Sequence, residues 1–232
     1  MKNLRSKWQD EVFAVYEKIK KEKKPYIIKM DGLYITVMPN VFSPKYFTDS
    51  LWFAKKIKKI VKNKSLLEVG TGTGIVALFA GISGAKVVVT DINKDAVKNA
   101  KLNFKKYKIN TIVRCGDIYK PIKKTERFDF IFWNHPFNNW GKPVRDVLLK
   151  AGFDYKYKSL SKYISGAKEH LLPKGRLLIG TGGFADLIRM KELAKKNNYK
   201  IKVLEKISVP LEDGIKSKIK NEYIILEFTQ NN

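Results

Sequence analysis

Residues 65–91 constrain the fold of this chain more than any other stretch. An apolar run, Leu66 to Val69, leads into the glycine segment GTGTG at 70–74; an apolar helical pattern follows, and a second apolar run ends in Asp91. The order of strand, tight glycine turn, helix and strand predicts one βαβ unit. Glycine gives the turn backbone angles closed to other residues and lets a ligand approach the main chain. We therefore expect this turn to hold a ligand.

The spacing of the glycines argues against two common nucleotide sites. A dinucleotide fingerprint places its third glycine three residues after the second, but here Gly74 comes one position early and Ile75 stands in its place. A phosphate-binding P-loop needs Lys-Ser/Thr after its last glycine, and Ile75-Val76 follow Gly74 instead. The spacing thus disfavours a nicotinamide cofactor and excludes ATP bound in the P-loop mode.

The pattern E-x-G-x-G-x-G with an acid at the end of the next strand resembles the first two motifs of the class I S-adenosylmethionine (SAM)-dependent methyltransferases. The resemblance implies that the turn passes under the methionine part of SAM and that the strand-end acid accepts both ribose hydroxyls, which suits a carboxylate. The alternative is that the glycines only tighten a βα corner. The implied SAM-binding residues here are Glu68, Gly70, Thr71, Gly72, Gly74, Asp91 and Ile92.

The length and the net charge of the chain limit the classes of protein to which it can belong. The chain has 232 residues, with 47 Lys and Arg against 22 Asp and Glu, a net charge of +25. A basic excess attracts polyanions, which favours RNA as a partner, although biased genome composition also produces lysine-rich chains. With no secretory segment and no apolar run of about 18 residues, we expect a cytoplasmic protein with no membrane partner. No metal site is expected, and Cys115, within the apolar run TIVRC, is expected to be buried.

Two regions are expected, an N-terminal extension over residues 1–48 and a methyltransferase domain over 49–232. Apolar residues at helical spacing predict a helix from Trp8 to Lys24 that covers one edge of the domain. The Asp31-Gly32 pair between two apolar runs predicts a hairpin. A further helix is expected to begin at Thr48 or Asp49, either of which can cap it, and to run to Lys62.

The segment before this helix carries a second resemblance. The run P-K-x-x-T-D-S-L at 44–51 is similar to the P-R-x-x-T-E-x-L segment of the release-factor glutamine methyltransferases, where it lies over the cofactor and substrate pocket. The resemblance implies a substrate-binding role for Thr48. Lys45 replaces the usual arginine and Asp49 the usual glutamate.

The predicted third strand, Thr111 to Cys115, is followed by Gly116-Asp117-Ile118. The family resemblance implies that Asp117, beside Ile118, accepts the adenine amino group of SAM, which an acceptor-only carboxylate can do. A local hydrogen bond within a turn is the alternative role for Asp117.

The chemistry is predicted to lie at Asn134-His135-Pro136-Phe137, directly after the apolar strand RFDFIFW. The motif resembles the N-P-P-Y/F motif of methyltransferases that act on planar nitrogen. The resemblance implies that the Asn134 oxygen and a backbone carbonyl hold the two N–H groups of the target, that Pro136 stiffens the loop, and that Phe137 stacks on the target. His135 stands where the family has proline; a proton acceptor, a target contact and a tolerated change are all open.

Residues 138–158 are expected to form a loop that selects the substrate. Trp140 and the lysines in this loop suit RNA contact, and packing of the aromatic residues within the protein is the alternative. Further along, we expect helices at 159–171 and 184–197, and strands at 175–180, 199–209 and 222–229.

Together these features predict an α/β, Rossmann-like class I methyltransferase fold: a mostly parallel seven-stranded sheet with its last strand antiparallel and helices on both faces. The expected reaction is SAM-dependent methyl transfer to a planar exocyclic nitrogen. An adenine or guanine amine in RNA is the first choice of substrate and a glutamine amide in a translation protein the second. A small molecule, or a non-catalytic SAM-binding subunit, is the remaining alternative. The sequence does not predict the oligomeric state.

Overall fold

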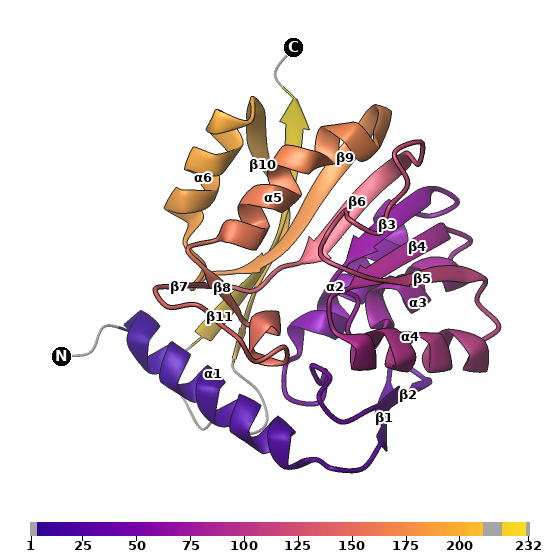
Figure 1. Ribbon diagram of the computed structural model, residues 1–232, viewed down its shortest axis with the longest axis vertical. Coiled ribbons are helices and arrows are strands. Elements are labelled where there is room, and N and C mark those ends of the chain that lie inside the picture. The colour runs from indigo at the N-terminus through magenta and orange to yellow at the C-terminus, as the bar shows by residue number, and fades with distance from the viewer. Residues whose placement is uncertain (1–3, 211–219, 231–232) are drawn as a thin grey trace.

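A seven-stranded sheet with the order β10-β11-β9-β6-β3-β4-β5 forms the centre of the protein (Figure 1). The computed structural model describes residues 4–210 and 220–230, and residues 1–3, 211–219 and 231–232 lie outside this description. The strands of the sheet are β3 (Ser65–Val69), β4 (Lys86–Asp91), β5 (Thr111–Cys115), β6 (Phe128–Asn134), β9 (Leu171–Gly182), β10 (Tyr199–Pro210) and β11 (Lys220–Gln230).

The directions of the strands confirm the predicted topology. Strands β5, β4, β3, β6 and β9 run parallel, whereas β11, the last strand of the chain, runs antiparallel to both of its neighbours, β9 and β10. The predicted glycine turn joins β3 to a helix and then to β4, which is the expected βαβ unit. Parallel strands place their carboxyl ends at one edge of a sheet, where ligands of α/β proteins bind.

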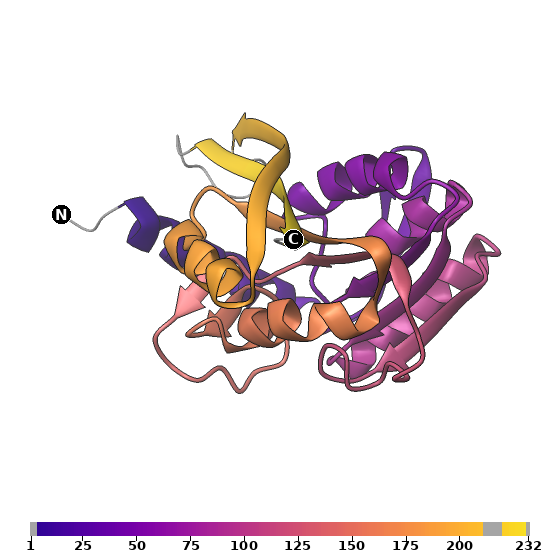
Figure 2. The same cartoon turned by 90° about the horizontal axis from the view of Figure 1, so that it is seen from above.

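Helices cover both faces of the sheet (Figure 2). The core on one face includes buried residues of α2 (Asp49–Ile60), α3 (Ile75–Ile82) and α4 (Lys94–Lys106), and the core on the other includes α5 (Lys158–Gly166) and α6 (Leu187–Lys196). Adjacent strand residues alternate between the two cores, since Leu66 packs in the first and Leu67 in the second. Because both faces of the sheet are buried, the central strands consist of nearly continuous runs of apolar residues.

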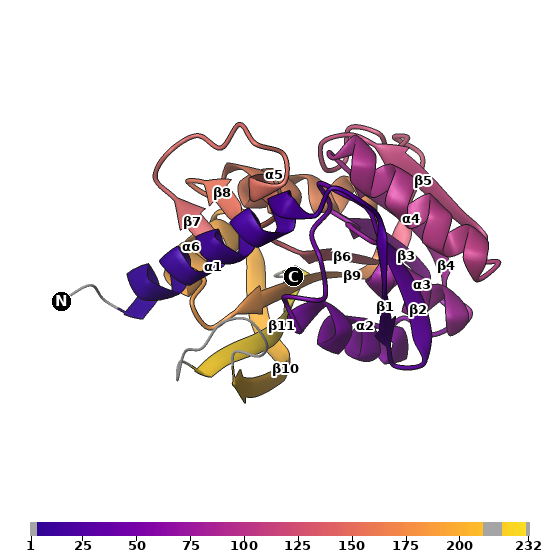
Figure 3. The same cartoon turned by 90° about the horizontal axis from the view of Figure 1, so that it is seen from below.

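The N-terminal residues add elements outside the central sheet. Strands β1 (Tyr26–Met30) and β2 (Leu33–Val37) form the predicted hairpin, which α4 holds through two asparagines. Asn99 Oδ1 accepts from the backbone N–H of Met38 at 2.7 Å, and Asn103 Oδ1 accepts from that of Thr36 at 2.9 Å. Helix α1 (Leu4–Lys21) lies alongside two short strands, β7 (Asn138–Trp140) and β8 (Phe153–Tyr155) (Figure 3).

The segment 138–158 is more ordered than the predicted loop. It contains the two three-residue parallel strands β7 (Asn138–Trp140) and β8 (Phe153–Tyr155) and the short helix η1 (Leu149–Ala151). Strands of three residues are too short to leave an alternating pattern in the sequence, and their pairing joins residues about fifteen positions apart. A second short helix, η2 (Ala167–His170), continues α5.

Two local expectations were wrong. Cys115 is exposed, because it is the last residue of β5, which is an edge strand of the sheet. Thr48 occupies the N-cap position of α2 but makes no capping bond, since its φ and ψ of −74° and −11° are already helical. Across the two described ranges, no helix is both long and apolar enough to cross a membrane.

Candidate active site

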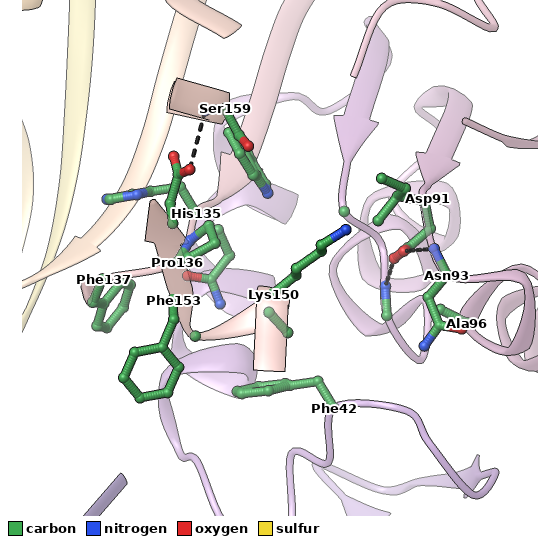
Figure 4. Close-up of a pocket in the computed structure, with 18 of the residues that line it drawn as sticks. Phe42, Asp91, Asn93, Ala96, His135, Pro136, Phe137, Lys150, Phe153 and Ser159 are labelled. Atoms are coloured by element: carbon green, nitrogen blue, oxygen red, sulfur yellow. Dashed lines mark hydrogen bonds between the residues drawn. The ribbon is translucent and has the colours of Figure 1, made fainter. Parts of the chain in front are cut away.

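A cavity of about 440 Å³ opens at the carboxyl ends of the parallel strands (Figure 4). Its wall includes the glycine turn after β3, Asp91 at the end of β4, Asp117 after β5 and the Asn134–Phe137 motif after β6. Volumes of 300–1,000 Å³ are typical of small-molecule sites. The fold therefore brings both predicted motifs to one cavity, although they lie more than 40 positions apart in the sequence.

Position 70, in the turn after β3, requires glycine for two reasons. Its φ is +65°, and a Cβ atom there would lie 2.6 Å from Nε1 of the Trp133 indole. Trp133 precedes the Asn134 motif on β6, so the close approach of Gly70 couples the two motifs sterically. At Gly72 the φ is also positive, +56°, but a Cβ atom would meet nothing within 4 Å, which leaves the main chain there open to a ligand.

Glu68 shapes the turn from within. It is buried, and its Oε2 accepts from the Thr71 hydroxyl at 2.8 Å and from the backbone N–H of Ala77 at 3.1 Å. Burial raises the pKa of Glu68 to about 8, since few polar groups offset the loss of water around the carboxylate. Glu68 and Thr71 therefore fix the turn and the start of α3 in addition to lining the cavity.

Asp91 is held in place by the backbone. Its Oδ2 accepts from the N–H of Gly72 at 2.9 Å and its Oδ1 from that of Asn93 at 2.8 Å, and burial raises its pKa to about 6. Each carboxylate oxygen keeps a further lone pair, so a fixed Asp91 at the cavity wall can still accept the two hydroxyls of a ribose. Asn93 caps the helix α4, and its side-chain oxygen accepts from the N–H of Asp95.

The remaining predicted cofactor residues lie around the same end of the cavity. Ile92 is 45% exposed and Ile118 is buried with a φ of +51°. Asp117 lines the cavity and accepts from Lys162 Nζ at 2.9 Å, which is a partner on α5 that the sequence did not indicate. Its role toward adenine stays a prediction.

Asn134 is oriented by Asp49. Its Nδ2 donates to Asp49 Oδ2 at 2.8 Å, so the amide cannot rotate without losing this bond. Asn134 Oδ1 is buried and has no hydrogen-bond partner among the described residues. Burial raises the pKa of Asp49 to about 6. An acceptor oxygen without a donor is what the predicted capture of a target N–H requires.

The other residues of the motif are closely packed. The His135 ring is buried beside Trp133 and Tyr157, its Nε2 lies 2.9 Å from Thr181 Oγ1, and burial lowers its pKa to about 3. A base this weak contributes little near neutral pH, which favours a packing role for His135 over proton transfer. Pro136 and Phe137 line the cavity, and the Phe137 carbonyl accepts from the Tyr157 hydroxyl at 2.7 Å.

The two predicted substrate residues lie in different places. Thr48 lines the cavity, with its hydroxyl 2.8 Å from that of Tyr223. Trp140 is absent from the lining of this cavity, and its ring contacts those of Phe13 and Phe153 at 5.3 and 5.2 Å between centroids. The packing alternative therefore describes Trp140 better than RNA stacking does.

Several lining residues were missed by sequence reasoning. Helix α1 contributes Trp8, Val12 and Tyr16 to the cavity wall, whereas it was expected only to cover an edge. Lys150 of η1 extends into the cavity between Asp91 and Pro136 (Figure 4). For Asp49, the sequence left two roles open, a helix cap or part of a segment over the pocket, and the structure places it in the cavity wall beside Asn134.

Comparison with known proteins agrees with this geometry. A family model described as the methyltransferase small domain matches residues 32–202. A Methanocaldococcus jannaschii protein, provisionally named a protein N5-glutamine methyltransferase, is 29% identical over 81% of this chain and 95% of its own length. The ribosomal RNA small subunit methyltransferase C of Mannheimia succiniciproducens is 27% identical over 75% of this chain, which spans only 51% of that relative.

Solved structures show the same fold. A methyltransferase from Pyrococcus furiosus superposes with a TM-score of 0.61 and 21% identity, covering 97% of this chain and 100% of the other. A T. thermophilus 16S rRNA guanine N2 methyltransferase, in complex with AdoMet and guanosine, gives a TM-score of 0.62 and 18% identity over 90% of this chain and 50% of the other.

The residues at the cavity fit SAM: an open glycine turn, a fixed carboxylate for the ribose and a nearby unpartnered amide oxygen. The family model covers most of the chain, including all of these groups. The chain therefore belongs to the methyltransferase small domain family and is a SAM-dependent methyltransferase.

Proposed function

We propose that the enzyme methylates an exocyclic amine of a nucleobase in RNA. The observation that carries the proposal is the unpartnered oxygen of Asn134 in an aromatic cavity. A flat base suits such walls, because base–aromatic stacking contributes about 1–3 kcal/mol per base. The net charge of +25 favours a polyanion over a neutral metabolite. The aromatic side chains that line the cavity are Trp8, Tyr16, Phe42, Tyr46, Phe47, Trp133, Phe137, Phe153, Tyr155 and Tyr223.

The residues act mainly by positioning. SAM, when bound, supplies a methyl group on a positively charged sulfur. The lone pair of an exocyclic amine is delocalised into the ring, and holding its N–H on Asn134 Oδ1 turns the nitrogen toward the methyl group. Bound SAM would leave as S-adenosylhomocysteine once its methyl group is transferred, and the proton released from the nitrogen would pass to water. Orientation of this kind contributes several kcal/mol to lowering a barrier.

Asp49 supports this arrangement by holding the Asn134 amide in one orientation. If the amide rotated, its NH₂ would face the target amine and repel it. His135 and Tyr157 pack behind the motif and fix the loop that carries Pro136 and Phe137.

A substitution at Asn134 tests the assignment. We expect Asn134→Ala to lower kcat by about 100-fold or more, with the Kd for SAM, measured by isothermal titration, within about twofold of the native value. Asn139→Ala is a matched control, since Asn139 lies outside the cavity lining and donates to Asp186. Unchanged turnover in Asn134→Ala would remove the catalytic role.

The substrate class is tested with SAM labelled on its methyl group. Incubation with total RNA, and separately with a ribosomal and translation protein fraction, should transfer the label to RNA. Label found only in protein would contradict the RNA proposal.

A glutamine amide in a translation protein is the second candidate. Two observations favour it: the M. jannaschii relative matches along 95% of its length, and residues 44–51 resemble the segment of release-factor methyltransferases. The amide also presents a planar nitrogen with two N–H groups, which Asn134 Oδ1 could hold in the same way.

A further inference from the structure

The basic side chains that line the cavity all come from one stretch of the chain. Among the described residues, three lysines lie in the cavity wall: Lys150 of η1, and Lys158 and Lys162 of α5. The two strand-end carboxylates of the predicted SAM site come instead from the central sheet. The positive charge of the cavity wall is therefore concentrated on one segment, apart from the strands that carry the cofactor residues.

Two of these lysines have no carboxylate partner in the described part of the protein. Lys162 Nζ lies 2.9 Å from Asp117 Oδ2, whereas Lys150 and Lys158 form no ion pair with a described residue. The carboxylate of Asp154, also in the cavity wall, is used otherwise, since it accepts from two backbone N–H groups at the start of α5 at 2.9 and 3.1 Å. Lys150 and Lys158 can therefore offer ammonium donors to a ligand.

Tyr155 holds Lys158 beside the cavity. The Tyr155 ring lines the cavity, and Lys158 Nζ lies 4.8 Å from its centroid. Lys156 Nζ lies 5.4 Å from the same centroid. A cation within about 6 Å of an aromatic centroid is attracted to the face of the ring. The ring thus keeps the Lys158 ammonium group close to the cavity.

The turn that carries these residues is strained and is tied to the target motif. Lys156 and Tyr157 both have a positive φ, +51° and +49°, which non-glycine residues seldom adopt. The Tyr157 hydroxyl donates to the Phe137 carbonyl at 2.7 Å, and the Lys156 N–H donates to the Trp140 carbonyl at 2.9 Å. Backbone strain of this kind is concentrated at functional sites. These bonds fix the position of Lys158 relative to the loop that carries Phe137.

Lys150 enters the cavity from η1. Figure 4 shows its side chain extending between Asp91, at the predicted ribose site, and Pro136, in the target motif. Because Lys158 is tied to the target loop and not to the glycine turn, an anion that contacts both lysines belongs to the methyl acceptor. The net charge of +25 favours a phosphate of a polyanion as this group.

We propose that Lys150 and Lys158 bind the backbone phosphate of the nucleotide whose base is methylated. This inference rests on the proposed function and adds a phosphate subsite to it, whichever base is the target. An ammonium group has three N–H donors and no acceptor, and charge-assisted hydrogen bonds to phosphate are about twice as strong as neutral ones. A glutamine amide has no negative charge beside its nitrogen and would leave both lysines unpaired.

Binding of nucleosides with and without a phosphate tests the subsite. The enzyme is saturated with S-adenosylhomocysteine and titrated calorimetrically, at low salt, with the common ribonucleosides and their 5′-monophosphates. For each base that binds, we expect the monophosphate to have a Kd at least about 10-fold lower than the nucleoside. A native enzyme that binds both forms alike would overturn the proposal.

The lysine variants assign this preference to residues. Lys150→Met keeps an unbranched side chain but removes the charge, so the advantage of the monophosphate should fall to about threefold or less, and Lys158→Met should reduce it in the same direction. The Kd of the nucleoside should not change, which a merely structural role would not predict. Lys150→Arg should keep most of the advantage. Lys142→Met is the matched control, since Lys142 is exposed, lies in the same segment and is absent from the cavity lining.

The alternative roles give different results. If Lys150→Met weakened S-adenosylhomocysteine and left the phosphate preference intact, Lys150 would bind the amino-acid part of the cofactor and the proposal would be wrong. An equal loss of preference in Lys142→Met would indicate a general effect of charge and would also overturn it.

Methylation of RNA separates this inference from the proposed function. With RNA as the acceptor, Lys150→Met should raise KM by about 10-fold and keep kcat within about twofold of the native value, as expected for a contact made equally before and during methyl transfer. RNA labelling with an unchanged KM in Lys150→Met would overturn the phosphate subsite alone. Label in protein only would overturn the proposed function, and the subsite with it.

Discussion

Gly70 combines a backbone requirement and a packing requirement in one residue. We expect Gly70→Ala to lower the free energy of unfolding by about 2–4 kcal/mol, because the left-handed φ costs about 1–2 kcal/mol and the Cβ atom would collide with Trp133. Gly72→Ala is the matched control. It shares the positive φ but has open space, so its cost should be about 1 kcal/mol. Urea unfolding without SAM measures both, and equal losses would contradict the packing argument.

The raised pKa of Glu68 predicts that the stability of the folded protein depends on pH. A carboxyl with its folded pKa raised to about 8, against an ordinary value of 4.5, binds its proton more tightly in the folded protein. Its contribution to stability is therefore present below about pH 4.5 and is lost as the pH rises toward 8. Asp49 and Asp91, with pKa values of about 6, add the same trend at lower pH.

Glu68→Gln removes one of these titrations while keeping an acceptor for Thr71 and Ala77. We expect the unfolding free energy of the native protein to fall by about 1–3 kcal/mol between pH 6 and 8, and that of Glu68→Gln to change less. Urea titrations at several pH values measure this. Parallel pH curves for the two proteins would disprove the assignment to Glu68.

At the scale of elements, α1 and the 138–158 segment form one wall. Phe13 of α1 stacks on Phe153 of this segment with ring centroids 4.3 Å apart, and Trp8 of α1 stacks on Phe184, beyond the segment, at 5.2 Å. The buried side of α1 therefore lines the cavity with Trp8, Val12 and Tyr16.

We expect Trp8→Ala to raise the KM for the methyl acceptor by about 2- to 10-fold, through the loss of one stacked pair, with the Kd for SAM changed less. Ile188→Ala, at a side chain that is 74% exposed, should leave both unchanged. Steady-state kinetics and titration of SAM test the two constants separately. An equal loss in SAM affinity would show that α1 supports the whole cavity.

For the whole molecule, the charge of +25 bears on binding, not on folding. If RNA is the substrate, its affinity should fall by about 10- to 100-fold between 50 and 200 mM salt, as expected for a few phosphate contacts. The affinity for SAM should change little. Filter binding over a salt series checks this, and a salt-independent RNA affinity would indicate that the charge does not contact phosphate.

Much of the fold could be predicted because the pattern of the central sheet is local. Continuous apolar runs, the glycine turn and the strand-end acid each lie within a few residues, and burial on both faces makes the runs unambiguous. The short strands β7 and β8 and the exposure of Cys115 depend on distant partners and on the position of a strand within the sheet, so they could not be predicted.

The cofactor motif, the planar-nitrogen motif and their order could be recognised from the amino-acid sequence, because each motif consists of neighbouring residues whose chemistry is fixed. The contacts between the motifs became visible in the folded structure. It brings Asp49 to Asn134 across 85 positions at 2.8 Å, lays α1 along the cavity, and sets Trp133 against Gly70. Contacts between residues so far apart depend on the packing of whole elements, which no local pattern encodes.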